Sequence, residues 1–251
     1  MNALKKLTVL GLALVMLTSC FDDMDYMPDE YWVDIATVEN PDSSSKFFFR
    51  LDNNTLMWVT SSNIPGYKPA GGQRIVANYS ILADTRQTGL YDYEVRLNDV
   101  YDVLTKGIFP ITPETQDSIG DDPIHIRDLW VGSKYLNFEF IYQGFNKTHY
   151  INLVYDSLKT YTDNKIHLEF RHNANDDLAV NNLWGVASFD LSSLEDPELD
   201  SIQLVIHVNL PNQTEVKLYE RTYHYGSEDL TPAEMSRKKS FGRKETVGIL
   251  K

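Results

Sequence analysis

Hydrophobic and polar residues alternate along most of this chain, and a period of two predicts β-strands that are buried on one face. Tyr93, Val95 and Leu97 are separated by polar residues, and the same alternation returns at 165–171 and 202–208. No segment has the three-to-four spacing of an ordinary amphipathic helix. The sequence therefore predicts an all-β protein.

The first half contains five predicted strands with short connections. An Asp-Asn-Asn sequence at 52–54 joins the second strand to the third, and these residues tolerate the backbone of a tight hairpin. Five such strands suit a small, partly open barrel of the OB type, which we assign to residues 31–109. The usual capping helix after the third strand is not visible. The predicted strands are residues 32–38, 46–51, 55–61, 74–82 and 93–104.

The second half predicts a different β module. Residues 110–123 are rich in Pro, Asp and Ser and lack a steady period, which indicates a linker. Residues 124–226 then contain seven short alternating strands, typical of an antiparallel β-sandwich. The single cysteine excludes the Cys-Trp-Cys framework of an antibody domain. The predicted strands are residues 124–131, 135–142, 148–155, 165–172, 186–191, 202–208 and 215–223.

The chain begins with a charged and then apolar leader that ends at its only cysteine, Cys20. The apolar run at 7–17 is shorter than the roughly 20 residues that span a bilayer as a helix. Leu-Thr-Ser-Cys at 17–20 resembles a bacterial lipobox, which implies that a signal peptide of residues 1–19 is removed and Cys20 is lipidated. The alternative is an ordinary signal peptide that ends at a cysteine. We predict that Cys20 is the lipid anchor and that no disulfide forms.

Residues 20–30 form an acidic segment behind the predicted anchor. Such a segment is either a solvated tether or, as in the surface lipoproteins of Bacteroidetes that it resembles, an export signal. Phe21 and Met24 interrupt the acidic run. We expect attachment to the outer membrane, with display on the cell surface left open.

The charge of the chain excludes one class of partner. Without the leader the chain has 21 basic and 36 acidic residues, a net charge of −15. Nucleic acid and anionic lipid surfaces are repelled by such a protein. Residues 227–251 are the exception, because 235–251 carry a net charge of +5. We expect a basic tail there, as a short helix or disordered, that is mobile or docks on the acidic body, lipid A phosphates or a partner.

Histidines are the first candidates for metal or acid–base chemistry. His167 and Glu169 would project from the same side of a strand and His172 from the other. A metal site would need further ligands from a neighbouring strand, so the interpretation that we prefer is a cross-strand charged pair on a solvated sheet face. The chain has six histidines, none with metal-ligand spacing: His125, His149, His167, His172, His207 and His224.

Other candidate sites have simple structural explanations. The oxygen-rich segment 173–177 could supply calcium ligands, but it lacks the order of a known calcium loop and ordinary turn chemistry explains it. Nucleophile motifs and phosphate-binding glycine patterns are missing. The four tryptophans could stack on a glycan, although we expect them in the core. These are Trp32, Trp58, Trp130 and Trp184.

Several segments together resemble the NigD-like lipoproteins of Bacteroidetes. The most distinctive is Leu-Glu-Phe-Arg-His-Asn-Ala at 168–174, and the segments at 72–82, 135–140 and 149–154 contribute. The resemblance spans roughly residues 20–225 and implies an N-terminal OB domain and a C-terminal β-sandwich. The name of the family links it to bacteriocin immunity, and no catalytic residues come with it.

We therefore expect a non-catalytic envelope lipoprotein that binds a protein, with no cofactor, no metal and no catalytic residue. The resemblance implies bacteriocin immunity as the role. The first alternative is a glycan-binding surface lipoprotein. The second alternative is a hydrolase that uses two carboxylates, because a chain with 36 acidic residues has some pairs of carboxylates close together in any fold.

Overall fold

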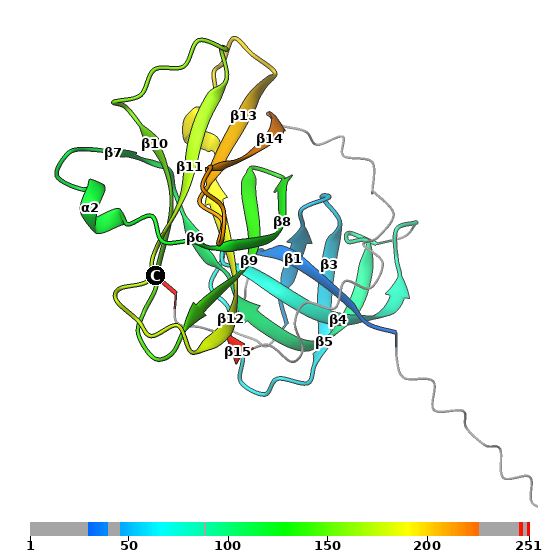
Figure 1. The fold of residues 1–251 in the computed structure, drawn as a ribbon. Coiled ribbons are helices and arrows are strands. Elements are labelled where there is room, and N and C mark those ends of the chain that lie inside the picture. Colours follow the sequence, from blue (N-terminus) through cyan, green and yellow to red (C-terminus); the bar gives the residue numbers. More distant parts are fainter. Residues whose placement is uncertain (1–29, 40–45, 88, 226–245, 248–249) are drawn as a thin grey trace, which may run out of the picture. The chain divides into compact units, whose positions relative to one another are not determined.

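The computed structural model describes residues 30–39, 46–87, 89–225, 246–247 and 250–251, and this part of the chain is almost entirely β (Figure 1). Tyr31–Lys251 form one compact unit. The predicted signal peptide, Cys20, nearly all of the acidic tether and most of the basic tail lie outside the described residues. The all-β prediction is confirmed, with a barrel followed by a sandwich.

The first domain is a five-stranded barrel with the strand order β1-β2-β3-β5-β4. Only β3 and β5 run parallel, and the other neighbours are antiparallel. The barrel is closed rather than partly open, because β1 pairs with β4 along six residues. Its strands are β1 (Trp32–Glu39), β2 (Phe48–Leu51), β3 (Leu56–Ser62), β4 (Arg74–Asp84) and β5 (Tyr93–Asp102).

Alternate residues of these strands fill the barrel interior. Phe47, Phe49, Met57 and Val59 are buried there, while the residues between them face outward. The predicted hairpin at 52–54 is present, and Asn54 has the positive φ of 69° that such a turn requires. The residues that alternate with the buried ones, such as Phe48 and Trp58, therefore form the outer face of the barrel.

The second domain consists of two sheets. The first has the order β14-β13-β11-β10-β7, and the second has the order β15-β12-β9-β8, with β6 also pairing to β12. The strands of the first sheet are β7 (Phe109–Ile111), β10 (Tyr150–Asp156), β11 (Ile166–Asn173), β13 (Ser201–Val208) and β14 (Lys217–His224). The strands of the second are β6 (Leu104–Lys106), β8 (His125–Gly132), β9 (Tyr135–Gly144), β12 (Asn181–Asp190) and β15 (Thr246–Val247).

The sheets are not wholly antiparallel. β11 and β13 run parallel, because the chain crosses to β12 in the other sheet and returns through a 3-10 turn, Ser192–Leu194. This pairing brings residues of β11 and β13 side by side that are about 40 residues apart in sequence. A crossover of this kind is not visible in a residue pattern.

The predicted linker at 110–123 is part of the sandwich. β7 pairs with β10, and a four-residue helix, α2 (Gln116–Ile119), follows it. Ile111 and Ile119 are buried together with Val154. These elements have only three or four residues, which is too short to produce a recognisable period.

The end of the chain also returns to the sandwich. Thr246 and Val247 pair with β12, and Leu250 forms a bridge with His149 beside β10. Lys251 exchanges backbone hydrogen bonds with His149 and Ile151. The described part of the predicted basic tail is therefore extended, and it covers exposed edges of both sheets.

The barrel and the sandwich share an apolar interface. Val33, Ile35 and Val76 of the barrel pack in one cluster with Trp184 and Val186 of β12. The two domains are therefore held by buried surface as well as by the chain that joins them.

Candidate functional site

β11 carries all but the last residue of the sequence segment 168–174, and its side chains alternate between two sheet faces as predicted. Leu168 and Phe170 enter the core between the sheets, followed by the buried His172. Glu169 and Arg171 face outward. The segment thus builds two separate polar networks, one on each side of the sheet.

The outer network is a cluster of ion pairs around Glu169, which is buried. Its carboxylate accepts hydrogen bonds from Lys159 Nζ (2.7 Å) and Arg171 Nε (2.8 Å). Arg171 also pairs with Asp121 at 3.3 Å. A small pocket of about 80 Å³ opens here, and its walls include His207 and Asn209.

This pocket contains two carboxylates, but they do not have the arrangement of a hydrolase. Paired catalytic carboxylates must flank open space for a sugar. Here the guanidinium of Arg171 pairs with both Asp121 and Glu169. Burial raises the pKa of Asp121, and the charge of Arg171 opposes that rise. The geometry is that of a charge-balanced cluster.

The predicted cross-strand charged pair is not found at His167, whose neighbour on the next strand is a second histidine. His167 Nδ1 lies 2.9 Å from Nε2 of His207, a residue of the parallel strand β13. The other ring nitrogen of His167, Nε2, lies 3.0 Å from Asp163 Oδ1. His167 also stacks on Tyr161, with ring centroids 3.5 Å apart. Burial first, and then the nearby His167, lowers the pKa of His207. Among the described residues, no three His, Cys, Asp or Glu side chains are placed to hold a metal ion.

The inner network is a buried chain of three side chains. His149 Nε2 lies 3.2 Å from Asp177 Oδ2, and His149 Nδ1 lies 2.7 Å from His172 Nε2. An ionised carboxylate can only accept, so His149 Nε2 donates to Asp177, and one proton is shared between His149 Nδ1 and His172 Nε2. His172 Nδ1 has no hydrogen-bond partner in the described part of the chain.

This arrangement shifts two pKa values. Burial, and then the neighbouring His149, lowers the pKa of His172 to about 4, because both disfavour its charged form more than the nearby Asp122 favours it. Burial alone would raise the pKa of Asp177. Hydrogen bonds from the Phe145 amide and from His149 outweigh it and hold the pKa well below its usual range. At neutral pH the chain therefore contains an ionised Asp177 and a neutral His172.

Segment 173–177 forms a turn. Asn175 and Asp176 have φ values of 55° and 52°, and Asp177 N donates to the Ala174 carbonyl. Lys147 Nζ lies 2.9 Å from the carbonyl oxygens of both Asn175 and Asp176. The ammonium group thus occupies oxygens that a calcium site would need.

Three large hydrophobic side chains stand exposed around this turn. Phe145, Leu178 and Val180 are 53%, 64% and 62% exposed. Asp177 accepts a 2.6 Å hydrogen bond from the Phe145 amide, and the pairing of Gly144 with Asn181 sets Val180 beside Phe145. We call these three residues the apolar tip.

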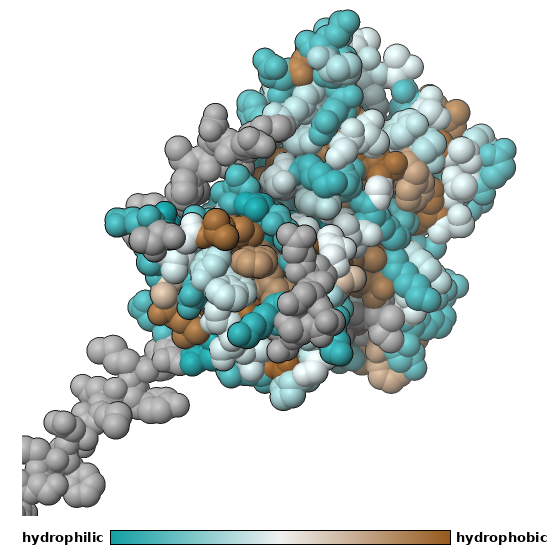
Figure 2. All heavy atoms as spheres, turned by 180° about the vertical axis from the view of Figure 1, so that it is seen from behind, coloured by the Kyte–Doolittle hydropathy of each residue, from teal (hydrophilic) through white to brown (hydrophobic). Residues whose placement is uncertain are grey.

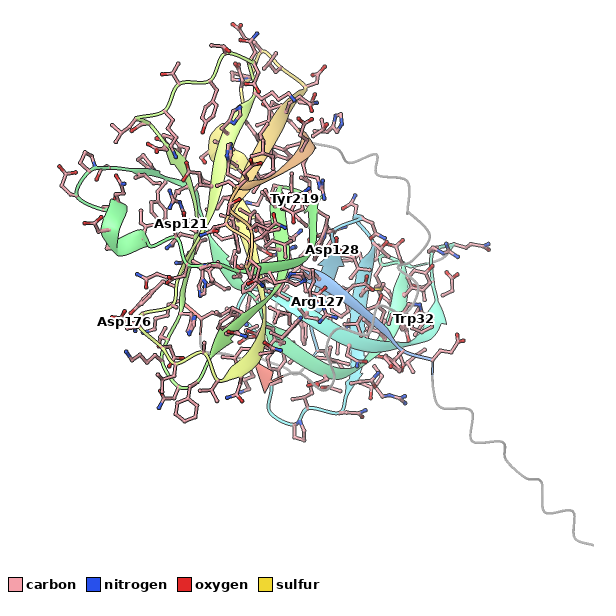
Figure 3. The ribbon with its side chains drawn as sticks, viewed as in Figure 1. Trp32, Asp121, Arg127, Asp128, Asp176 and Tyr219 are labelled. Carbon is pink, nitrogen blue, oxygen red and sulfur yellow. The ribbon has the colours of Figure 1, made fainter. Side chains whose placement is uncertain are left out.

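The apolar tip lies at one end of the sandwich. Asp176, in the adjoining turn, is on the opposite side of the view in Figure 3 from Trp32 of the barrel. Viewed from behind, the surface carries hydrophobic residues in separate groups between hydrophilic ones (Figure 2). The sequence contained one signal for the tip, because Leu178 and Val180 fall between predicted strands. It contained none for the pairing of His149 with Asp177.

The tryptophans have different environments. Trp184 is buried and donates a 3.0 Å hydrogen bond to Glu139. Trp32 and Trp130 are half-buried and pack against core clusters. Trp58 is half-buried on the outer face of the barrel, beside other aromatic residues. Three of the four therefore contribute to the core, as expected.

No helix in the described residues is long and apolar enough to cross a membrane. The fold defines a two-domain β protein, an OB barrel joined to a β-sandwich. The chain belongs to the NigD-like family. Residues 35–103 match its N-terminal OB domain, and residues 107–223 match its C-terminal beta sandwich domain.

Solved structures share this architecture. A protein of unknown function from Bacteroides vulgatus is 30% identical, with 80% of this chain and 94% of that chain covered and a TM-score of 0.68. A NigD-like immunity protein from Bacteroides caccae is 17% identical, with 79% and 98% covered and a TM-score of 0.61. A Bacteroides fragilis protein provisionally described as a lipoprotein is 14% identical, with 80% and 100% covered and a TM-score of 0.57. The comparison with curated proteins finds no significant match.

Proposed function

We propose that this chain is a non-catalytic lipoprotein of the cell envelope that binds another protein through the apolar tip. The observation that carries the proposal is the exposure of Phe145, Leu178 and Val180, each by more than half. Single exposed hydrophobic residues are normal, but a group of three large ones on adjoining loops is typical of an interaction surface.

The tip is held in place before any partner binds. Asp177 accepts hydrogen bonds from the Phe145 amide and from His149, and its carboxylate is only 1% exposed. Lys147, in the loop that follows β9 and contains Phe145, donates hydrogen bonds to the turn that precedes Leu178 and so holds the two loops together. Because the loops are already ordered, a partner gains the burial of the tip with little loss of conformational entropy.

The expected partner is a basic protein. The chain without its leader has a net charge of −15, which attracts cations over a long range and repels acidic proteins. A basic partner with an apolar cleft would be steered by the charge and held by the tip.

The proposed anchor is the lipid on Cys20, which places the protein on a membrane surface, with the outer membrane as our choice. The B. fragilis structure described as a lipoprotein supports an anchor, and the B. caccae immunity protein supports a defensive role. We infer that the partner is a toxin such as a bacteriocin, which the anchored protein would intercept at the envelope.

Complementation tests this role. A strain without the gene should become sensitive to a basic toxin secreted by competitors, and the wild-type gene should restore resistance. A gene carrying Phe145→Ser with Leu178→Ser should not restore it, whereas Leu199→Ser, at a residue that is 51% exposed elsewhere, should. Unchanged sensitivity after deletion would remove the immunity role, and full rescue by the double variant would remove the tip from it.

A further inference from the structure

A second surface of different chemistry lies on the outer face of the barrel. Cross-strand pairing sets Phe48 of β2 beside Trp58 of β3, and Trp58 beside Glu94 of β5. All three are half-exposed, and they form one row across three strands. Their neighbours in sequence, such as Met57 and Val59, are the ones that fill the barrel.

The aromatic members of this row form a cluster with Tyr91. Phe48 and Trp58 are stacked with ring centroids 5.9 Å apart, and Tyr91 meets Trp58 edge-on at 4.8 Å. The Tyr91 hydroxyl donates a 2.8 Å hydrogen bond to Glu94 Oε1. The cluster therefore has a carboxylate at its edge that is oriented by one of its own rings.

Polar side chains continue the surface along β5. Arg96 Nε lies 3.3 Å from Asn98 Oδ1, and Asn98 donates a 3.0 Å hydrogen bond to Ser80 Oγ on β4. Flat aromatic rings thus adjoin carboxylate, guanidinium and amide groups. We call Phe48, Trp58, Tyr91, Glu94 and Arg96 the aromatic face.

We propose that the aromatic face binds an uncharged oligosaccharide. OB barrels take oligonucleotides or oligosaccharides on strands 2 and 3 and on the loop between strands 4 and 5. Phe48 and Trp58 lie on those strands, and Tyr91 lies in that loop. The net charge of −15 opposes a polyanion, so the uncharged sugar is the class that fits.

The chemistry of the face matches this ligand. The apolar CH groups of a sugar ring can stack on Trp58 and Tyr91, which supply large, rigid apolar surfaces. Glu94 can accept hydrogen bonds from sugar hydroxyls, and the guanidinium of Arg96, with its five N–H groups, can donate to them. Trp58 packs against none of the core clusters of the described residues, so its ring stays on the outer face of the barrel, where a sugar can reach it.

The test is affinity electrophoresis of the full chain, purified in non-ionic detergent, through gels that contain a polysaccharide. The uncharged probes are laminarin, glucomannan, arabinoxylan and galactomannan, and the anionic probes are heparin and single-stranded DNA. At least one uncharged probe should retard the chain, and neither anionic probe should. Retardation by no uncharged probe, or retardation by an anionic one, would overturn the proposal.

Variants locate the site. Trp58→Ala should weaken binding at least tenfold, and Trp58→Phe should retain most of it. Glu94→Gln, which keeps the shape of the side chain, should weaken binding about fivefold and serves if Trp58→Ala does not fold. Phe145→Ser in the apolar tip should leave sugar binding unchanged, which separates this site from the proposed protein site. Full binding by Trp58→Ala and Glu94→Gln would overturn the assignment.

Discussion

Arg74 and Asp52 are joined by two hydrogen bonds, of 2.5 and 3.0 Å, at the place where the barrel meets the sandwich. Asn137 of β9 completes a triangle, accepting from Arg74 Nη2 at 2.8 Å and donating to Asp52 at 3.0 Å. Arg74 is buried, and its guanidinium also lies over the ring of Tyr135. This pair ties β4 and the turn between β2 and β3 of the barrel to the second sheet of the sandwich.

Replacement of Arg74 should destabilise the whole fold. Arg74→Met would leave the Asp52 carboxylate largely buried without its cation, a change that costs about 3 kcal/mol in the free energy of unfolding. Urea denaturation of both forms measures this difference. The matched control is Arg86→Ala, which breaks an exposed pair with Asp84 and should leave the free energy of unfolding almost unchanged. Equal effects of the two variants would show that the buried pair does not join the domains.

Asp34 should destabilise the protein at neutral pH. Burial raises its pKa to about 6, although a hydrogen bond from Tyr79 opposes the rise. Because the folded pKa is above the unfolded value, the folded state binds more protons between about pH 4 and 6 and loses stability as the pH rises through that window. Asp34→Asn should therefore gain about 2 kcal/mol at pH 8 and almost nothing at pH 4, by urea denaturation. A gain of the same size at both pH values would contradict the raised pKa.

The sequence predicts the strands of both domains well, because alternation is strong wherever one face of a sheet is buried. It misses β6, β7, α2 and β15, which have two to four residues each. It places His172 on the inner face of β11 correctly. It predicts a cross-strand charged pair at His167 but not its actual neighbour, because His207 comes from a parallel strand that only the crossover through β12 brings alongside. Cross-strand partners depend on topology, which the residue pattern of a single strand does not contain.

His172 should make the protein sensitive to acid. Its folded pKa of about 4 lies below the unfolded value near 6.5. The unfolded state therefore binds more protons between those values, and stability falls as the pH drops from 6.5 to 4, by at most about 3 kcal/mol. His172→Gln should lose this part of the pH dependence in urea titrations at pH 7 and pH 4.5. The exposed His224→Gln should keep it, and an unchanged slope in His172→Gln would place the acid sensitivity elsewhere.

Cys20→Ser should release the protein from the membrane without unfolding it, because the anchor lies outside the folded unit Tyr31–Lys251. Cell fractionation with an antibody against the sandwich measures the distribution, and the circular dichroism of the released chain measures its fold. Retention of the variant in the membrane fraction would show that attachment does not depend on a lipid at Cys20.

Site-specific photo-crosslinking in living cells tests the central claim, that the apolar tip binds a protein. A photoreactive phenylalanine analogue at Leu178 should give one major adduct with a basic protein, and Phe145→Ser in the same chain should remove that adduct. The analogue at Leu199, which is similarly exposed but distant in sequence, should give none. An adduct at Leu199 of equal yield, or no protein adduct at Leu178 under conditions in which the toxin is present, would contradict the account.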